Sequence, residues 1–281
     1  MNLYEYQGEI ITTDTFIDRL SPYIRKGDTL VLRIDMMRFG KMATGIKKSE
    51  FLDEIFDIFY RLVGNEGNII TPTFSYSWGM DSSEKIFDVR NTPGKVGVFP
   101  EYFRKRDDTI RNLDPMFSFA IWGKDKELFS RNEGKTSFGK DSLYNKVHKL
   151  NAKLISFGLI QYNHTFIHYV EQWYHENIDE IEYRFIKKFQ GRIIDYDGAS
   201  YDDYQYCFSR YLDRSFGPRV NGRKLLTDLR KIKKLNEIKI GNAYVNISDC
   251  ESVFDVGIKG MKADPLYFMD KIGVMGCMDK V

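Results

Sequence analysis

A buried strand, an amphipathic helix and a second buried strand follow one another near the start of the chain, and this order constrains the fold most. Residues 29–34 read Thr-Leu-Val-Leu-Arg-Ile after a Lys-Gly-Asp turn signal. From residue 49 to residue 63 apolar residues recur three and four positions apart, which predicts a helix. Residues 68–71 supply the next strand and Pro72 ends it. The pattern predicts an α/β fold, a layered mixed β-sheet flanked by helices.

The same signals continue along the chain. Residues 117–122 and 153–157 have strand character, residues 164–176 are helical, and a basic helix is expected around 224–234. Residues 75–109 are rich in Gly, Ser, Asp and Pro and read as a long, functional loop. We expect a single domain over 1–281, with a small C-terminal subdomain over 185–246.

Composition excludes several classes of protein. The chain has 42 Lys and Arg against 40 Asp and Glu, a net charge of +2, so there is no cationic excess for binding a nucleic acid. Its apolar runs are too short to span a membrane, and its three cysteines are scattered. The N-terminus has no secretory pattern, so we expect a cytoplasmic protein. No P-loop, GxGxxG or nucleophile elbow occurs.

Three of the four histidines gather in one predicted helix. His164, His168, Glu171 and His175 are spaced by four, three and four residues, so they share one helical face. A metal site of the HExxH type would need a glutamate where Thr165 stands. The alternatives are a His–Glu dyad, with His168 as a general base oriented by Glu171, and a solvated polar face without chemistry.

Hydroxyl and carboxyl groups also follow the predicted strands. Thr71, Thr73, Ser75 and Ser77 lie just beyond one strand end, where α/β folds commonly bind ligands. These hydroxyls either hold a ligand or satisfy backbone groups of a turn. Asp35 either points into a cleft or caps the turn that follows it.

The chain resembles the aminoglycoside 3-N-acetyltransferase family, through six short blocks in the same order. They lie at residues 33–40, 63–75, 87–104, 111–118, 138–142 and 165–171, and the last carries Thr165, His168 and Glu171. Asp114–Pro115 stands where the antibiotic-modifying branch has His-Pro, Ile34–Asp35 stands in place of a Ser pair, and Asn163 is one place earlier than expected. Tyr183–Arg184–Phe185 is similar to a segment of the branch that acts on nucleotide-linked amino sugars, such as the N-acyltransferase of anthrose biosynthesis.

The resemblance implies a single acyltransferase domain that transfers an acetyl group from acetyl-CoA to the primary amine of a nucleotide-linked amino sugar. We expect a dTDP-sugar and a role in surface-polysaccharide synthesis (O-antigen, lipopolysaccharide or capsule). The alternative is an aminoglycoside 3-N-acetyltransferase that gives antibiotic resistance, and a third class is a binding relative without catalysis. The sequence leaves the oligomeric state open, a homo-oligomer included.

The resemblance also implies roles for individual residues. His168 is the expected base, Glu171 fixes its tautomer, and Thr165 or Ser75 donates to the oxyanion. Attack is expected to be direct, because Cys207, Cys250 and Cys277 stand in no activated motif. No metal is expected. Coenzyme A should lie near Arg38, Phe39, Gly40, Lys41, Ser137, Phe138, Gly139 and Ser142. The sugar should meet Asp35, Thr73, Ser75, Asp88, Arg111 and Asp114.

Overall fold

A mixed seven-stranded sheet forms the centre of the protein. The computed structural model describes residues 1–79, 84–159, 164–210 and 220–269. The sheet order is β12 (Asn236–Ile240), β13 (Ala243–Asp249), β9 (Lys153–Phe157), β3 (Thr29–Ile34), β5 (Asn68–Pro72), β8 (Phe119–Gly123) and β7 (Ile110–Arg111). Strand β3 is parallel to both of its neighbours, β9 and β5, and the other pairs are antiparallel.

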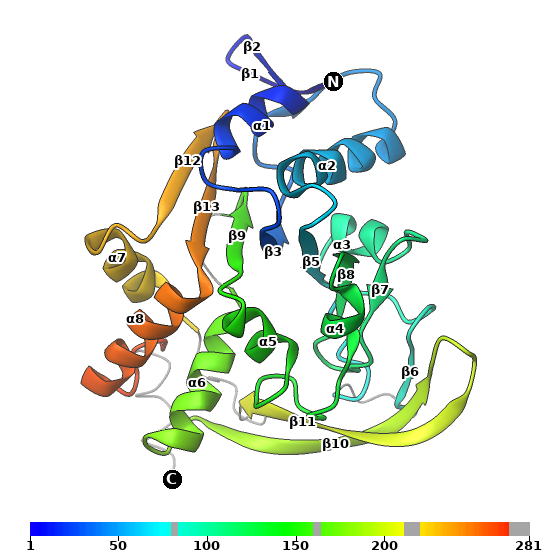
Figure 1. Cartoon of the computed structure of the whole chain (residues 1–281), viewed down its shortest axis with the longest axis vertical. Coiled ribbons are helices and arrows are strands. Elements are labelled where there is room, and N and C mark those ends of the chain that lie inside the picture. Colours follow the sequence, from blue (N-terminus) through cyan, green and yellow to red (C-terminus); the bar gives the residue numbers. More distant parts are fainter. Residues whose placement is uncertain (80–83, 160–163, 211–219, 270–281) are drawn as a thin grey trace.

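Helices cover both faces of this sheet, as Figure 1 shows. One face packs against α1 (Thr13–Leu20), α2 (Lys48–Val63) and α3 (Val98–Phe103). The other packs against α4 (Lys126–Ser130), α5 (Leu143–Lys149), α6 (Phe166–Asn177), α7 (Arg223–Lys231) and α8 (Cys250–Ala263). The side chains of β3 contribute to the cores on both faces. Leu30 and Leu32 lie in the core under α1, α2 and α3, and Val31 lies in the core under α4 to α8. Successive strand residues face opposite sides, so a strand buried on both faces is apolar throughout.

Two smaller sheets complete the fold. One has the order β2 (Glu9–Thr12), β1 (Asn2–Tyr6) and β4 (Lys41–Met42). The other has the order β11 (Ser200–Arg210), β10 (Arg184–Ile194) and β6 (Ile86–Asp88). In Figure 1 the long β10–β11 hairpin runs along one end of the molecule, from the neighbourhood of α6 to β6. The first residues of this hairpin therefore lie beside α6, the helix that carries His168 and His175.

The structure confirms the predicted fold class and most of the predicted elements. Strands β3 and β9 and helices α2, α6 and α7 lie where the residue patterns place them. The prediction of a long loop over 75–109 is partly wrong, because β6 and α3 form within it. The subdomain over 185–246 stays a prediction; its residues are shared between the hairpin and strands β12 and β13 of the central sheet. Asn163 and Cys277 lie outside the described residues. Within the described ranges, no helix has the length and apolar character needed to cross a bilayer.

Candidate active site

Helix α6 carries the histidine and the glutamate on which the prediction depends. It begins after Thr165 and buries its apolar side chains in the core shared with α5 and α8: Phe166, Ile167, Val170 and Tyr174. His168 and Glu171 are three residues apart and so occupy one face of the helix. The apolar pattern that folds α6 therefore also fixes the orientation of both polar side chains.

His168 and Glu171 form a close pair. The imidazole Nδ1 lies 2.7 Å from Oε2 of Glu171. The Glu171 side chain is fully buried, whereas 17% of the His168 side chain is exposed. A carboxylate accepts hydrogen bonds, so Nδ1 carries the proton and Nε2 is left as the basic nitrogen. The dyad interpretation therefore fits the geometry better than a solvated polar face does.

Arg184, at the start of β10, is the third member of this cluster. Its Nε lies 2.9 Å from Oε2 of Glu171 and its Nη2 lies 3.1 Å from Nδ1 of His168. Nη1 donates to the carbonyl oxygen of Phe208 at 3.2 Å, which fixes the guanidinium. The Tyr183 hydroxyl donates to the other Glu171 oxygen, Oε1, at 3.1 Å. The hairpin thus delivers two neighbouring residues to the carboxylate.

These contacts decide the charge of Glu171. Burial alone would raise the pKa of its carboxyl, but the Arg184 charge and the hydrogen bonds from His168 and Tyr183 outweigh burial and lower it. Glu171 is therefore a carboxylate near neutral pH. A buried carboxylate beside an imidazole stabilises the imidazolium form, which a general base must reach during the reaction.

Aromatic rings enclose the other side of His168. The Phe138 ring meets the imidazole edge-on with centroids 5.5 Å apart, and Phe138 stacks on Tyr144 at 5.6 Å. The Tyr144 phenol in turn interacts with the hydroxyl of Thr165. Of the predicted residues, Thr165, His168, Glu171 and Phe138 therefore belong to one contiguous cluster.

The loop that carries Phe138 is joined to β11. Ser137 donates its backbone N–H to the carbonyl oxygen of Tyr206 at 2.9 Å, and its hydroxyl accepts from Gln205 at 3.3 Å. A Cβ on Gly139 would come within 2.7 Å of Nε2 of Gln172, so the Gln172 side chain would have to move to admit one. Ser142 caps α5 by accepting from the Asn145 N–H at 3.2 Å.

The hydroxyls beyond β5 bond to the protein itself. Thr73 donates its hydroxyl to that of Ser118 at 3.2 Å, and Ser75 donates to the carbonyl oxygen of Pro115 at 2.8 Å. Ser77 donates to the same carbonyl at 2.9 Å. The Ser75 and Ser77 bonds correspond to the second interpretation of the pattern, in which hydroxyls satisfy backbone groups. Thr71 lies inside β5, and its buried hydroxyl has no hydrogen-bond partner among the described residues.

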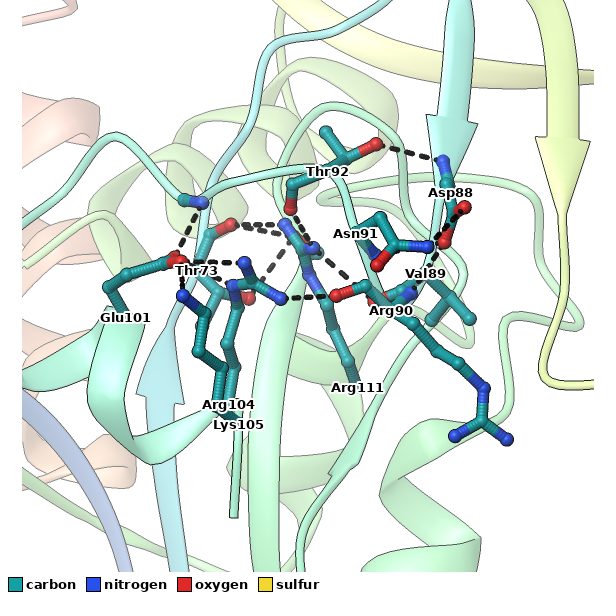
Figure 2. A network of polar contacts seen from close by, with 12 residues as sticks. Thr73, Asp88, Val89, Arg90, Asn91, Thr92, Glu101, Arg104, Lys105 and Arg111 are labelled. Carbon is teal, nitrogen blue, oxygen red and sulfur yellow. Dashed lines mark hydrogen bonds and ion pairs between the residues drawn. The ribbon is translucent and has the colours of Figure 1, made fainter. Parts of the chain in front are cut away.

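Arg111 holds two loops together, and Figure 2 shows it at the centre of a polar network. Its guanidinium donates to the backbone carbonyls of Thr92 at 2.5 Å, Thr73 at 2.8 Å and Val89 at 3.4 Å. Nε donates to the Ser118 hydroxyl at 3.1 Å. Burial lowers the pKa of Arg111 to about 10, which keeps it cationic near neutrality. The geometry is that of a structural tie between loops.

Two carboxylates complete the network in Figure 2. Glu101 holds Arg104 through two bonds of 2.6 Å and accepts the Gly94 N–H at 2.9 Å. Asp88 accepts the N–H groups of Arg90 and Asn91, each at 2.9 Å, in a turn. The predicted sugar-binding residue Asp88 therefore caps its own loop.

Asp114 is fully enclosed. Its Oδ1 accepts the N–H groups of Met116 at 2.8 Å and Phe117 at 2.9 Å, and its Oδ2 accepts from Gln205 at 3.2 Å. Burial raises the pKa of this carboxyl despite those bonds. Asp114 thus organises the turn that presents Pro115.

The turn after β3 separates its predicted residues. Asp35 pairs with Arg38 at 3.0 Å, and both remain partly exposed. Phe39 is fully buried and its ring lies 4.4 Å from that of Phe157, so its side chain belongs to the core. Gly40 lies so close to the Glu5 carbonyl oxygen that a Cβ at this position would come within 2.6 Å of it. Lys41 is exposed in β4. A hollow of about 670 Å³ opens beside this turn, lined by Arg38, Gly158, Arg230, Tyr244 and Asn246 among others.

Sequence reasoning missed the part played by Arg184. The Tyr183–Arg184 pair was noticeable only as a block of the family resemblance, because nothing in its spacing connects it to a helix that ends at Asn177. No group of three metal-ligating side chains occurs in the part of the chain that the structure describes.

Solved structures share this fold. The AAC-IIIb binary complex with CoASH has a TM-score of 0.70 at 17% identity, covering 90% of this chain and 97% of that one. AAC-VIa bound to sisomicin has a TM-score of 0.72 at 17% identity, covering 90% and 98%. YokD from Bacillus subtilis has a TM-score of 0.72 at 16% identity, covering 90% and 94%. No curated protein sequence matches the chain significantly.

The fold and the family define an acyl-CoA-dependent N-acyltransferase. The family model described as aminoglycoside 3-N-acetyltransferase matches residues 33–262, most of the length. The chain belongs to the aminoglycoside 3-N-acetyltransferase family, and acetyl-CoA is its co-substrate.

Proposed function

We propose that this enzyme acetylates the primary amine of a nucleotide-linked amino sugar, with His168 as the general base. The observation that carries the proposal is the cluster of His168, Glu171 and Arg184, in which a buried carboxylate fixes a partly exposed imidazole. A partly exposed imidazole with a buried anionic partner at Nδ1 is an arrangement that suits general-base catalysis.

The reaction follows from this geometry. The amine nitrogen attacks the thioester carbonyl carbon of acetyl-CoA while Nε2 of His168 accepts the amine proton. The carbonyl π electrons move onto oxygen, and we assign the Thr165 hydroxyl, which bonds to the Tyr144 phenol in this structure, as a donor to that oxyanion. When the tetrahedral intermediate collapses, the C–S bond breaks and the thiolate takes the proton from the imidazolium. The products are the amide and CoA as its free thiol.

Arg184 and Tyr183 position the carboxylate in this scheme. Nδ1 of His168 donates its proton to Glu171, so it cannot also accept a hydrogen bond from the nearby Arg184. The Arg184 guanidinium instead acts as the positive partner of the Glu171 carboxylate. The tyrosine hydroxyl holds the second oxygen. Together they prevent Glu171 from turning away from His168.

We place coenzyme A along the turn after β3 and the 137–142 loop. Arg38 supplies a half-exposed guanidinium at the edge of the 670 Å³ hollow, which suits a phosphate group. Phe39 contributes only its backbone, since its ring is buried. Phe138 lies beside His168, so its loop borders the position of the thioester.

The three carboxylates predicted to contact the sugar do not form an acidic pocket for a polycation. Asp88 caps its own turn and Asp114 is enclosed by donors, so neither can meet an ammonium group. Asp35 is partly exposed and pairs with Arg38. The near-neutral composition, 42 cationic against 40 acidic residues, points the same way.

The second candidate is acetylation of an aminoglycoside. The observation that favours it is structural similarity to proteins solved with such ligands, AAC-VIa with sisomicin and AAC(3)-IVa with apramycin.

One assay separates the two candidates. Purified enzyme is mixed with acetyl-CoA and one acceptor from a panel of dTDP-, UDP- and GDP-linked amino sugars and aminoglycosides, and thiol release is followed. We expect turnover with a nucleotide-linked amino sugar. Turnover with aminoglycosides alone would select the second candidate.

A further inference from the structure

Three polar residues lie side by side on the face of the central sheet that packs against α6. Arg33 of β3 is the register partner of Ser156 in β9, and Ser156 is the partner of Asn246 in β13. Val31 and Leu154, two positions before Arg33 and Ser156, both belong to the core on the α6 side. Because side chains alternate along a strand, Arg33, Ser156 and Asn246 face that side too. Adjacent strands are about 4.8 Å apart, so this polar row spans about 10 Å.

Each residue of the polar row has a polar group that makes no hydrogen bond within the described part of the chain. Ser156 is 0% exposed and Asn246 is 6% exposed, yet Ser156 Oγ and Asn246 Oδ1 have no hydrogen-bond partner among the described residues. In the same described ranges the half-buried Arg33 guanidinium makes no hydrogen bond or ion pair. A buried polar atom without a partner costs about 1–3 kcal/mol, and two of them on neighbouring strands beside an unpaired guanidinium are rare in a folded protein.

The surroundings of the polar row connect it to the candidate active site. Arg33 lies close enough to Tyr144 and His164 to interact with both electrostatically. Tyr144 stacks on Phe138, whose ring meets His168. At the other end, Asn246 lines the 670 Å³ hollow that also contains Arg38.

The positive charge at this place belongs to Arg33. Burial, together with the Arg33 charge, lowers the pKa of His164 to about 3, so that imidazole is neutral near physiological pH. Tyr144 is also neutral, because burial raises the pKa of its phenol. A ligand group that reaches the polar row therefore meets one fixed cation among uncharged neighbours.

We propose that Arg33, Ser156 and Asn246 form a subsite that binds a phosphate group of a ligand of this enzyme. A guanidinium binds phosphate oxygens through two parallel N–H bonds, and the Ser156 hydroxyl adds a neutral donor. The Asn246 amide donates through Nδ2, which takes the place of the unpartnered Oδ1 when the amide group is flipped. The cation in the row excludes a metal ion or a substrate ammonium from the same place. The phosphate comes either from coenzyme A or from the nucleotide-linked acceptor; the second source rests on the proposed function.

Direct binding tests the proposal without requiring turnover. The affinities of CoA and of dTDP are measured separately by titration calorimetry for wild type, Arg33→Gln, Arg33→Lys and Ser156→Ala. Arg19→Gln, an exposed arginine on α1, is the matched control. We expect Arg33→Gln to weaken one of the two ligands about 10- to 100-fold, Ser156→Ala to weaken the same ligand about 3- to 10-fold, and Arg33→Lys to recover part of the affinity.

The ligand that is weakened identifies the source of the phosphate. A loss confined to CoA assigns the subsite to the donor, and a loss confined to dTDP assigns it to the acceptor. Unchanged affinity for both ligands in Arg33→Gln and Ser156→Ala would overturn the proposal. The proposed function fails differently, by the absence of thiol release with every nucleotide-linked amino sugar, while CoA binding still reports on the subsite.

The melting temperature of Ser156→Ala gives a second test, because a ligand-binding role and a purely structural role of Ser156 predict opposite changes. Ser156→Ala removes a buried hydroxyl that has no partner among the described residues, so the ligand-free variant should melt at the same temperature as wild type or higher. If Ser156 served only the fold, its removal would lower the melting temperature and leave ligand affinity unchanged.

Discussion

Replacing Glu171 with glutamine tests the catalytic cluster most severely, because the change alters charge with little change in shape. The carboxylate has three partners: Arg184 at 2.9 Å, His168 at 2.7 Å and Tyr183 at 3.1 Å. An amide cannot neutralise Arg184, and removing one partner of a buried ion pair costs about 3–5 kcal/mol. We therefore expect Glu171→Gln to lose stability of that order.

Catalysis should fall further than stability explains. Without the carboxylate, His168 loses the acceptor that keeps the proton on Nδ1, and its imidazolium loses a buried counter-charge. A positioned general base contributes about 10²–10⁴-fold, so kcat should fall within that range. The assay is thiol release from acetyl-CoA at saturating acceptor concentration. It is run at a temperature at which urea unfolding of the variant shows that it is folded in the absence of urea.

Tyr183→Phe is the graded comparison. It removes one of the hydrogen bonds that position the carboxylate but leaves the contacts with His168 and Arg184 in place, so it should cost about 1 kcal/mol of stability and lower kcat much less than Glu171→Gln does. A folded Glu171→Gln enzyme whose kcat stays within about threefold of wild type would refute the dyad.

Three further predictions concern stability. Arg111→Met should cost about 3 kcal/mol or more, measured by urea unfolding, because it leaves the Thr73, Val89 and Thr92 carbonyls without their donor. Ser142→Ala should cost about 1 kcal/mol through the lost cap of α5, and an unchanged stability would contradict that role. The pKa of Glu171 in the folded protein lies below its ordinary value of 4.5. The ionised carboxylate therefore contributes its full stabilisation above pH 4.5, and this stabilisation is lost as the pH falls through the lowered pKa. The melting-temperature gap between wild type and Glu171→Gln should therefore be constant near neutral pH and narrow as the pH falls below 4.5.

The elements that sequence reasoning located are those with long, regular apolar patterns. Strand β3 is one example, because its residues Leu30, Val31 and Leu32 are apolar and buried on both faces of the sheet. The sixteen-residue helix α2 is another, because its apolar residues recur over its whole length. Strand β6 and helix α3, of three and six residues, are too short for a period to appear. Tertiary contacts stabilise them: β6 pairs with β10, and α3 buries Phe99 and Phe103 in the core.

The site was predictable only where its residues are neighbours in the chain. His168 and Glu171 are one helical turn apart, so their spacing reveals the pair. Arg184 joins them through a hairpin. Ser156 and Asn246 join Arg33 through strand pairing, and no local pattern shows which strands will be neighbours. Strand order is a property of the whole fold.

The central claim is that His168 accepts the amine proton during acetyl transfer. The most direct measurement is thiol release by purified, folded His168→Ala with acetyl-CoA and the best nucleotide-linked amino sugar from the panel, compared with wild type. We predict a fall in kcat of about 10²-fold or more with acetyl-CoA binding retained. Near-wild-type turnover by His168→Ala with that acceptor would contradict it.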